Sequence, residues 1–182
     1  LDGTVFTLDT ASRKRFLRFI AVPWRKIYRR DLLERHGIRF PVGDHFYEDN
    51  PFHWFALLTA ESIAIVPEVL CYHRVGRAGQ TMATADERLF KIFDHHATIR
   101  AWLIERGLDR DFGASLLGWV ISQAEWISAR TPPDLERRLF DILVAIVALY
   151  PSGTISAALH EGQKGQRAHR LADAVARRDF PA

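Results

Sequence analysis

The chain has 182 residues, of which 48% are hydrophobic and 26% charged, a composition typical of a folded globular protein that excludes an intrinsically disordered one. Its formal net charge of +3 is too small to indicate a nucleic-acid-binding protein, so we expect no nucleic acid among its partners. The one cysteine, Cys71, excludes an intramolecular disulfide and suits a reducing cytoplasm.

Two short helices are predicted near the start of the chain. The first covers residues 10–21 and is ended by Pro23, which has no N–H group to donate. Its apolar face consists of Phe16, Phe19 and Ile20. The second lies within residues 29–40, where Asp31 is the predicted N-cap and Gly37 ends the helix.

The clearest β signal is "ESIAIVPEVLCYHRV", residues 61–75. Its β-branched and aromatic residues predict two short strands, at 62–66 and 69–75. Pro67 separates the two strands, because proline cannot donate a hydrogen bond to a neighbouring strand.

From about residue 85 the pattern becomes helical. Apolar residues recur every three or four positions, and Gly107 and the Thr-Pro-Pro run at 131–133 interrupt them. The predicted helices cover 85–106, 111–130 and 134–149, and a basic helical tail covers 163–180. The first helix should bury Leu89, Ile92, Phe93, His96, Ile99 and Leu103, and the second Phe112, Leu116, Trp119, Val120, Gln123, Trp126 and Ile127. We therefore predict an α/β chain, with a mixed segment at 1–83 and a mainly helical C-terminal region at 84–182.

A pair of carboxylates stands out in "VGDHFYEDNPFHWF", residues 42–55. Glu48 and Asp49 precede Asn50-Pro51, which predicts the start of another helix because proline is favoured at the first helical position. The buried stripe of this helix should consist of Phe52, Phe55, Ala56 and Thr59. In one interpretation the carboxylates are helix caps and nothing more, since free N–H groups and the helix dipole stabilise negative charge.

The same position also suits catalysis. A carboxylate fixed at a helix N-terminus can act as a general base that takes a proton from a hydroxyl group. The approach would be lined by aromatic faces and polar edges, which suit a sugar ring. These lining residues are His45, Tyr47, His53 and Trp54.

A candidate phosphate-binding loop occurs in "YHRVGRAGQTM", residues 72–82. His73 and Arg74 end the second predicted strand, and a glycine-containing loop follows with Arg77, Gln80 and Thr81. Guanidinium groups bind phosphate oxygens bidentately, so the loop could hold a diphosphate. A solvated turn is the alternative interpretation.

A third candidate stretch is "VPWRKIYRRDLL", residues 22–33. Trp24, Lys26 and Tyr28 place basic and aromatic side chains close together in it. The run could pack under a site or cover the edge of a sheet.

In order, these stretches resemble the second half of the catalytic domain of family-2 glycosyltransferases with the GT-A fold. The most similar kind is the bacterial one that builds capsular, exopolysaccharide or lipopolysaccharide sugars. These enzymes carry a Trp-x-Lys-x-Tyr-Arg run, a Gly-Ile-x-Phe approach, a Phe/Tyr-Glu-Asp-x-x-Phe motif, and a strand pair that ends in Tyr-x-x-Arg or Tyr-Tyr-Arg before a short polar loop. The matching residues are Trp24, Lys26, Tyr28 and Arg29, then Gly37, Ile38 and Phe40, then Tyr47, Glu48, Asp49 and Phe52, and finally Tyr72, His73, Arg74, Arg77, Gln80 and Thr81.

The resemblance implies an inverting enzyme that transfers a sugar from a nucleotide-sugar donor to a saccharide or lipid-linked acceptor. Asp49 would be the catalytic base, beside Glu48. Arg74 and Arg77 would help to hold the donor diphosphate. The other expected substrate-binding residues are Gln80, Thr81, His73, Trp24, Lys26, His45 and Trp54.

Members of this family begin with a nucleotide-binding half that ends in an Asp-x-Asp motif for a divalent metal, Mn or Mg. Nothing before Trp24 resembles that half, so the resemblance implies a C-terminal portion that holds no metal and is inactive alone. A sheet left open at its edge predicts self-association into a homo-oligomer. We expect a cytoplasmic location. The basic tail could be a solvated helix, or it could contact the cytoplasmic face of the inner membrane.

Two other functions stay open from the residues. The first is a non-catalytic helical interaction or oligomerisation module, in which the carboxylates are caps and the partner binds helices that carry Trp102, Trp119 and Trp126. The second is a metal-dependent hydrolase. Its ligands would be Asp44, His45, Glu48 and Asp49.

Overall fold

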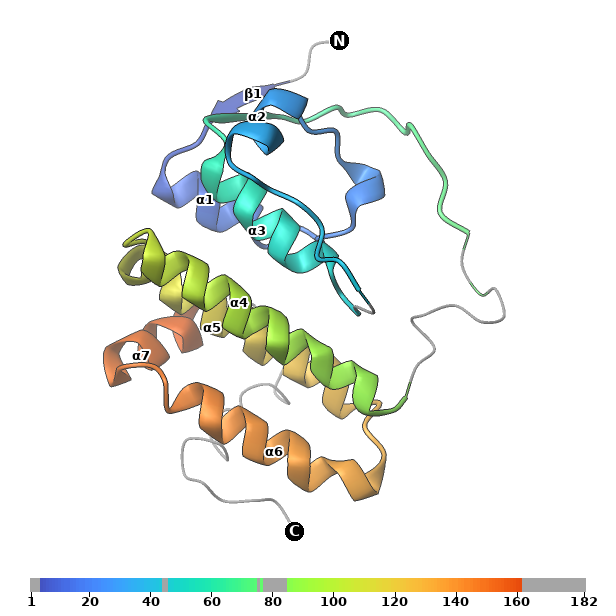
Figure 1. Ribbon diagram of the computed structural model, residues 1–182, viewed down its shortest axis with the longest axis vertical. Helices are drawn as coiled ribbons and strands as arrows, with labels where there is room; N and C mark the ends of the chain where they lie inside the picture. The colour runs from blue at the N-terminus through green and yellow to red at the C-terminus, as the bar shows by residue number, and fades with distance from the viewer. Residues whose placement is uncertain (1–3, 44–45, 75, 77–84, 162–182) are drawn as a thin grey trace. The chain divides into compact units, whose positions relative to one another are not determined.

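The computed structural model describes residues 4–43, 46–74, 76 and 85–161 (Figure 1). The chain divides into two compact units, residues 1–83 and residues 84–182. Each unit has helices and a core of its own, and each is described by itself below. The described part contains a small two-stranded sheet and is otherwise mainly helical.

The helix α3, Asp49–Thr59, is the element around which the first unit packs. Helix α1, Thr10–Phe16, and helix α2, Arg30–Arg35, both contact it. Its buried side chains include Phe52 and Ala56, as predicted, whereas Phe55 and Thr59 are half-buried. The apolar core of this unit consists of Leu8, Phe16, Leu17, Ala21, Ile38, Phe52, Trp54, Ala56, Leu57 and Leu58.

The sheet of the first unit is formed by β1, Val5–Thr7, and β2, Ser62–Ala64. The strands are antiparallel, with Phe6 opposite Ile63. The predicted strand at 62–66 is therefore confirmed in a shorter form, and β1 was missed. The predicted strand at 69–75 is wrong for its described residues, 69–74, which are not in a strand. Among the described residues, 66–73 form no backbone–backbone hydrogen bonds, because no neighbouring strand follows them past Pro67.

Helix α1 begins and ends differently from the prediction. Its N-cap is Asp9, whose carboxylate accepts a 2.7 Å hydrogen bond from the N–H of Ser12, while the Ser12 hydroxyl accepts one from the N–H of Asp9. The helix ends at Phe16, so Phe19 and Ile20 lie outside it and are exposed. The apolar periodicity continued past the helix, which is why the predicted end was too late.

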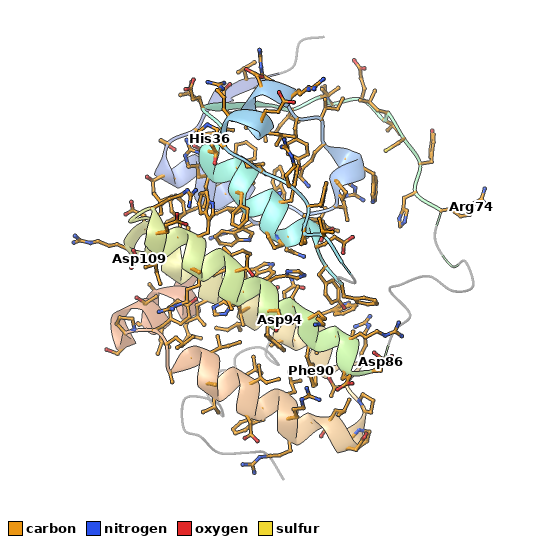
Figure 2. The ribbon with its side chains drawn as sticks, viewed as in Figure 1. His36, Arg74, Asp86, Phe90, Asp94 and Asp109 are labelled. Carbon is orange, nitrogen blue, oxygen red and sulfur yellow. The ribbon has the colours of Figure 1, made fainter. Side chains whose placement is uncertain are left out.

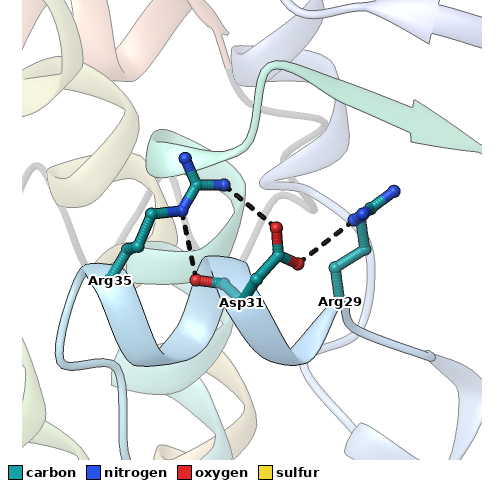
Figure 3. A network of polar contacts seen from close by, with 3 residues as sticks. All are labelled: Arg29, Asp31 and Arg35. Atoms are coloured by element: carbon teal, nitrogen blue, oxygen red, sulfur yellow. Dashed lines mark hydrogen bonds and ion pairs between the residues drawn. The ribbon is translucent and has the colours of Figure 1, made fainter.

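Helix α2 shows that Asp31 is not an N-cap. The N-cap position is occupied by Arg29, and Asp31 lies in the first turn (Figure 3). There its carboxylate accepts hydrogen bonds from the side chains of Arg29 and Arg35, each at 3.2 Å. The predicted end is confirmed, because Gly37 has a φ of +61°, a conformation that glycine adopts without strain.

The second unit contains the helices α4, Lys91–Glu105, α5, Asp109–Ser128, α6, Pro133–Val147, and α7, Ser152–Glu161. Helix α5 contacts each of the other three. A short 3₁₀ turn, Glu87–Phe90, precedes α4 in the segment where a continuous helix was predicted. The predicted buried stripe of this segment is confirmed in full, because Leu89, Ile92, Phe93, His96, Ile99 and Leu103 are all buried.

The α5 stripe is confirmed in part. Phe112, Leu116, Val120 and Ile127 are buried, whereas Trp119, Gln123 and Trp126 are half-buried. In two of the tryptophan-bearing helices an arginine packs on the ring. The guanidinium of Arg106 lies 4.2 Å from the ring centre of Trp102, and that of Arg130 lies 4.0 Å from the ring centre of Trp126.

No single helix among the described residues is long and apolar enough to cross a membrane. Helices α6 and α7 meet that test of length and composition only as a pair, and they are bent by 117° at the break between them. The predicted basic tail, residues 163–180, lies outside the described residues.

A histidine is buried in the core of the second unit. One ring nitrogen of His96, Nε2, lies 2.7 Å from the hydroxyl of Tyr150. Burial, assisted by the nearby charge of Arg100, lowers the pKa of His96 to about 4. The folded state therefore resists protonation of a ring that the unfolded chain protonates near pH 6.5.

We predict that stability falls as pH drops from about 6.5 toward 4, because the unfolded state then binds a proton that folded His96 does not. The loss from this group reaches about 1.4 kcal/mol per pH unit. Urea denaturation at pH 7, 6 and 5 should show a smaller loss in His96→Gln, which keeps a polar partner for Tyr150 and cannot titrate. The control is His36→Gln, at the exposed end of α2 (Figure 2), which should behave like the wild type. An equal pH dependence of the free energy of unfolding in wild type and His96→Gln would show that His96 is not the group responsible for the loss.

Candidate active site

The turn that leads into α3 is fixed by Asn50. Its backbone N–H and its side-chain amide both donate to the carbonyl oxygen of Tyr47, at 3.0 and 3.1 Å. Tyr47 has a φ of +64°, which is unfavourable for a bulky side chain by about 1–3 kcal/mol. The helix starts at Asp49 rather than after Asn50, so the predicted boundary was late by two residues. The strained turn places Glu48 and Asp49 at the first turn of the helix.

The two carboxylates differ in their surroundings. Glu48 is exposed, stands at the N-cap position and makes no side-chain capping bond. Asp49 is half-buried, and its Oδ1 accepts a 3.0 Å hydrogen bond from the side-chain amide of Asn50. Burial raises the pKa of Asp49, and the negative charge of Glu48 raises it further. The N–H groups of Asp49 and Asn50 and the charge of Lys26 oppose this rise without cancelling it.

Lys26 supplies positive charge to the site from the loop after α1. Its ammonium group donates to the carbonyl oxygens of Ile20 and Val22, which anchors the side chain. Burial lowers the pKa of Lys26, while the charge of Asp49 opposes that change. The charges of Lys26 and Asp49 therefore interact in the structure, and the sequence had assigned both residues to one site.

The aromatic residue Tyr28 packs directly on α3. Its ring lies edge-on to Phe52 at 5.0 Å between ring centres, and Phe40 stacks on Phe52 at 4.2 Å. Burial raises the pKa of the Tyr28 hydroxyl to about 12, and the charge of Asp49 contributes to this rise. Through Tyr28 this run therefore packs on helix α3. The sequence did not select Tyr28 as a site residue, although it lies two residues after Lys26.

The residues after Asp49 in α3 are more buried than the sequence suggested. Trp54 is only 1% exposed, which favours a packing role over direct contact with a ligand. His53 is 2% exposed and lies one helical turn after Asp49. Burial lowers the pKa of His53 to about 4, and the charge of Lys26 adds to this effect, so the ring is neutral at physiological pH.

A second pair of predicted binding residues is brought together by side-chain stacking. The rings of Trp24 and His73 lie 4.9 Å apart with an angle of 28° between their planes. The guanidinium of Arg25 lies 4.6 Å from the centre of the Trp24 ring. The thiol of Cys71 approaches the carbonyl oxygen of Trp24 at 3.8 Å. This contact fastens the end of the extended segment to the 3₁₀ turn Pro23–Arg25.

Arg74 lies at the far end of the extended segment that follows β2 (Figure 2). It is exposed. The other residues proposed for substrate binding, His45, Arg77, Gln80 and Thr81, lie outside the described residues, as does Asp44.

The described residues contain no group of three or more His, Cys, Asp or Glu side chains that could hold a metal ion. In this part of the chain, the carboxylates of Glu48 and Asp49 are therefore not joined by a third ligand. The metal-dependent hydrolase hypothesis would need Asp44 and His45, which the structure does not describe.

Comparison with known proteins gives one informative similarity. Over 57 residues, 31% of this chain, the sequence is 40% identical to a protein of Bacillus subtilis strain 168 named "Uncharacterized glycosyltransferase EpsJ". The matched stretch spans 17% of the length of that protein. No family model matches the chain, and no solved structure matches it significantly. The comparison supports a relationship to glycosyltransferases.

We predict that Asp49→Asn raises the thermal denaturation midpoint of the chain at pH 7. The pKa of Asp49 is raised in the folded state, so its ionised form opposes folding at any pH above that raised value. Asparagine keeps the acceptor oxygen for Asn50 and removes the charge. The difference should disappear near pH 3, where aspartic acid is protonated in both states.

The matched control is Asp31→Asn in α2. The hydrogen bond from Arg29 is the main cause that lowers the pKa of Asp31, so loss of this exposed charge should lower the midpoint slightly at pH 7. A lower midpoint for Asp49→Asn as well would show that its carboxylate is a stabilising helix cap.

Proposed function

We propose that this chain is the acceptor-side portion of a family-2 glycosyltransferase with the GT-A fold, of the bacterial kind that builds cell-envelope polysaccharides. The similarity to a protein named as a glycosyltransferase supports the general activity. The observation that carries the specific assignment is the position of Asp49. It is a half-buried carboxylate with a raised pKa, fixed at the start of α3 within the Tyr47-Glu48-Asp49 motif.

The environment of Asp49 suits a general base. A raised pKa makes an ionised carboxylate a stronger base. The hydrogen bond from Asn50 orients the carboxylate, and the anchored charge of Lys26 favours its ionised form. These contacts fix the direction from which an acceptor hydroxyl would approach.

In the proposed reaction, the Asp49 carboxylate takes the proton of an acceptor hydroxyl. The acceptor oxygen attacks the anomeric carbon of the nucleotide sugar and forms the new glycosidic bond. The bond from that carbon to the diphosphate oxygen breaks on the opposite face, and the nucleoside diphosphate leaves with the electron pair. The configuration at the anomeric carbon is inverted.

The donor side of the reaction is assigned by expectation only. Arg74 and Arg77 would neutralise the leaving diphosphate, with Gln80 and Thr81 nearby in sequence. The described residues do not provide a ligand set for the divalent metal, Mn or Mg, that the family implies, so no step here depends on a metal held by them. The cytoplasmic location, the membrane contact and the homo-oligomer also stay predictions.

The test is Asp49→Asn in the complete natural protein that contains this chain. Loss of the base should lower the transfer rate by about 10²–10⁴-fold, while the KM for the donor stays within about twofold. Transfer is measured with radiolabelled uridine diphosphate sugars and with methyl glycosides of glucose, galactose and N-acetylglucosamine as acceptors. Asp31→Asn is the control for charge removal. Undiminished transfer in Asp49→Asn would return the carboxylate to a capping role.

A second variant separates the roles of the two carboxylates. Glu48 raises the pKa of Asp49 and is exposed, so we predict that Glu48→Gln keeps transfer activity but lowers the pKa of the base. The rate depends on ionised Asp49, so the acid limb of the pH–rate profile should move to lower pH. If the acid limb of the pH–rate profile stays at the wild-type pH in Glu48→Gln, a group other than Asp49 controls the rate there. Loss of transfer in Glu48→Gln with full activity in Asp49→Asn would make Glu48 the base.

A further inference from the structure

The hydroxyl group of Tyr28 is a buried polar group that the described chain leaves without a hydrogen-bond partner. Buried hydroxyl groups usually have such a partner, because an unpaired one destabilises the fold. An exception near a candidate site therefore points to a ligand that completes the bond. The same unit holds a second exception, since neither ring nitrogen of buried His53 has a partner.

The position of the Tyr28 ring is fixed by its packing. It meets Phe52 edge-on at 5.0 Å, and Phe52 is itself covered by Phe40 at 4.2 Å. Phe52 follows Asp49 by three residues in α3, so the two side chains project from the same side of the helix. The Tyr28 ring is thus held beside the part of α3 that carries the proposed base.

On the basis of the proposed function, we propose that Tyr28 is a further acceptor-binding residue. The hydroxyl is closed to solvent in the free chain, so the acceptor must displace the side chains that cover it before one of its hydroxyl groups bonds with Tyr28, while Asp49 binds the hydroxyl that reacts. Neighbouring carbons of a sugar ring carry hydroxyl groups that both donate and accept. A saccharide can therefore satisfy two separate protein oxygens at once.

The electrostatics of the cluster agree with this role. Burial and the charge of Asp49 raise the pKa of Tyr28 to about 12, so its hydroxyl keeps its proton and can donate at neutral pH. His53 lies one turn beyond Asp49. The charge of Lys26 lowers the pKa of His53 and reduces the rise in the pKa of Asp49. The backbone carbonyl oxygens of Phe16 and Leu17 raise the pKa of His53 slightly, but neither forms a hydrogen bond with its ring. The first unit therefore contains, besides the Tyr28 hydroxyl, a second buried side chain whose polar atoms have no partner among the described residues.

The competing explanation is that the Tyr28 hydroxyl has only a structural role. The chain contains a suitable comparison in Tyr150, whose hydroxyl lies 2.7 Å from His96. Removal of a satisfied hydroxyl and removal of an unsatisfied one have opposite effects on stability. The same substitution at both positions therefore separates the two explanations.

The stability test compares Tyr28→Phe with Tyr150→Phe in this chain. We expect Tyr28→Phe to melt at the wild-type temperature or above it, because no protein bond is lost. Tyr150→Phe should melt about 2–4 °C lower, since one hydrogen bond is lost in a chain of this size. A lower melting temperature for Tyr28→Phe would overturn the inference, because it would mean that the hydroxyl has a partner within the protein.

The binding test uses the complete natural protein and the same donors and methyl glycoside acceptors as above. Tyr28→Phe should raise the KM for the acceptor about tenfold, as expected for one lost hydrogen bond, and leave the KM for the donor within about twofold. Tyr150→Phe removes a hydroxyl that lies 2.7 Å from His96 in the second unit, has no role in the proposed site, and should change neither KM. An unchanged acceptor KM in Tyr28→Phe, with active wild type, would overturn the role of Tyr28 alone. Absence of transfer by the wild type would overturn the proposed function and this inference together.

Discussion

The packing of Phe52 is the constraint on which the geometry of the candidate site depends. Its ring is stacked on Phe40 and met edge-on by Tyr28, so three successive segments of the chain meet at one side chain. Asp49 lies one turn earlier on the same helix, and its direction follows from where Phe52 holds α3. The aromatic contact therefore positions helix α3, and the hydrogen bonds of Asn50 then fix the turn and the Asp49 carboxylate at its start.

The surroundings of Asp49 make its ionised form unfavourable for folding, and this is the residue that we propose as the base. Burial raises the pKa of Asp49, and the exposed Glu48 beside it adds repulsion. A helix start selected only for stability would place its carboxylates where the N–H groups of the first turn outweigh those effects. The strained Tyr47 belongs to the same turn, so two unfavourable features coincide at one position. That coincidence is typical of functional sites.

The sequence predicted the helices well because their apolar residues follow a regular local period. The stripe from Leu89 to Leu103 is buried throughout. Boundaries set by local hydrogen bonds were less accurate, as the Asp9 cap and the start of α3 at Asp49 show. Pairing in space could not be predicted: among the described residues, 69–74 have no neighbouring strand, and β1 was missed because three residues give a weak alternation. The contact between Tyr28 and Phe52 and the burial of Trp54 have no local signal either.

The extended segment after β2 has a consequence for local stability. Residues 66–73 form no backbone–backbone hydrogen bonds among the described residues, and the rings of Trp24 and His73 supply an attachment near their end. Opening this attachment would break one ring stack and the weak contact of the Cys71 thiol with the Trp24 carbonyl oxygen, and would leave the β1–β2 ladder and α3 unchanged. The amide hydrogens of the segment should consequently exchange with solvent far faster than those of α3. The part of the chain that carries Arg74 can then reorganise around a partner without any global unfolding.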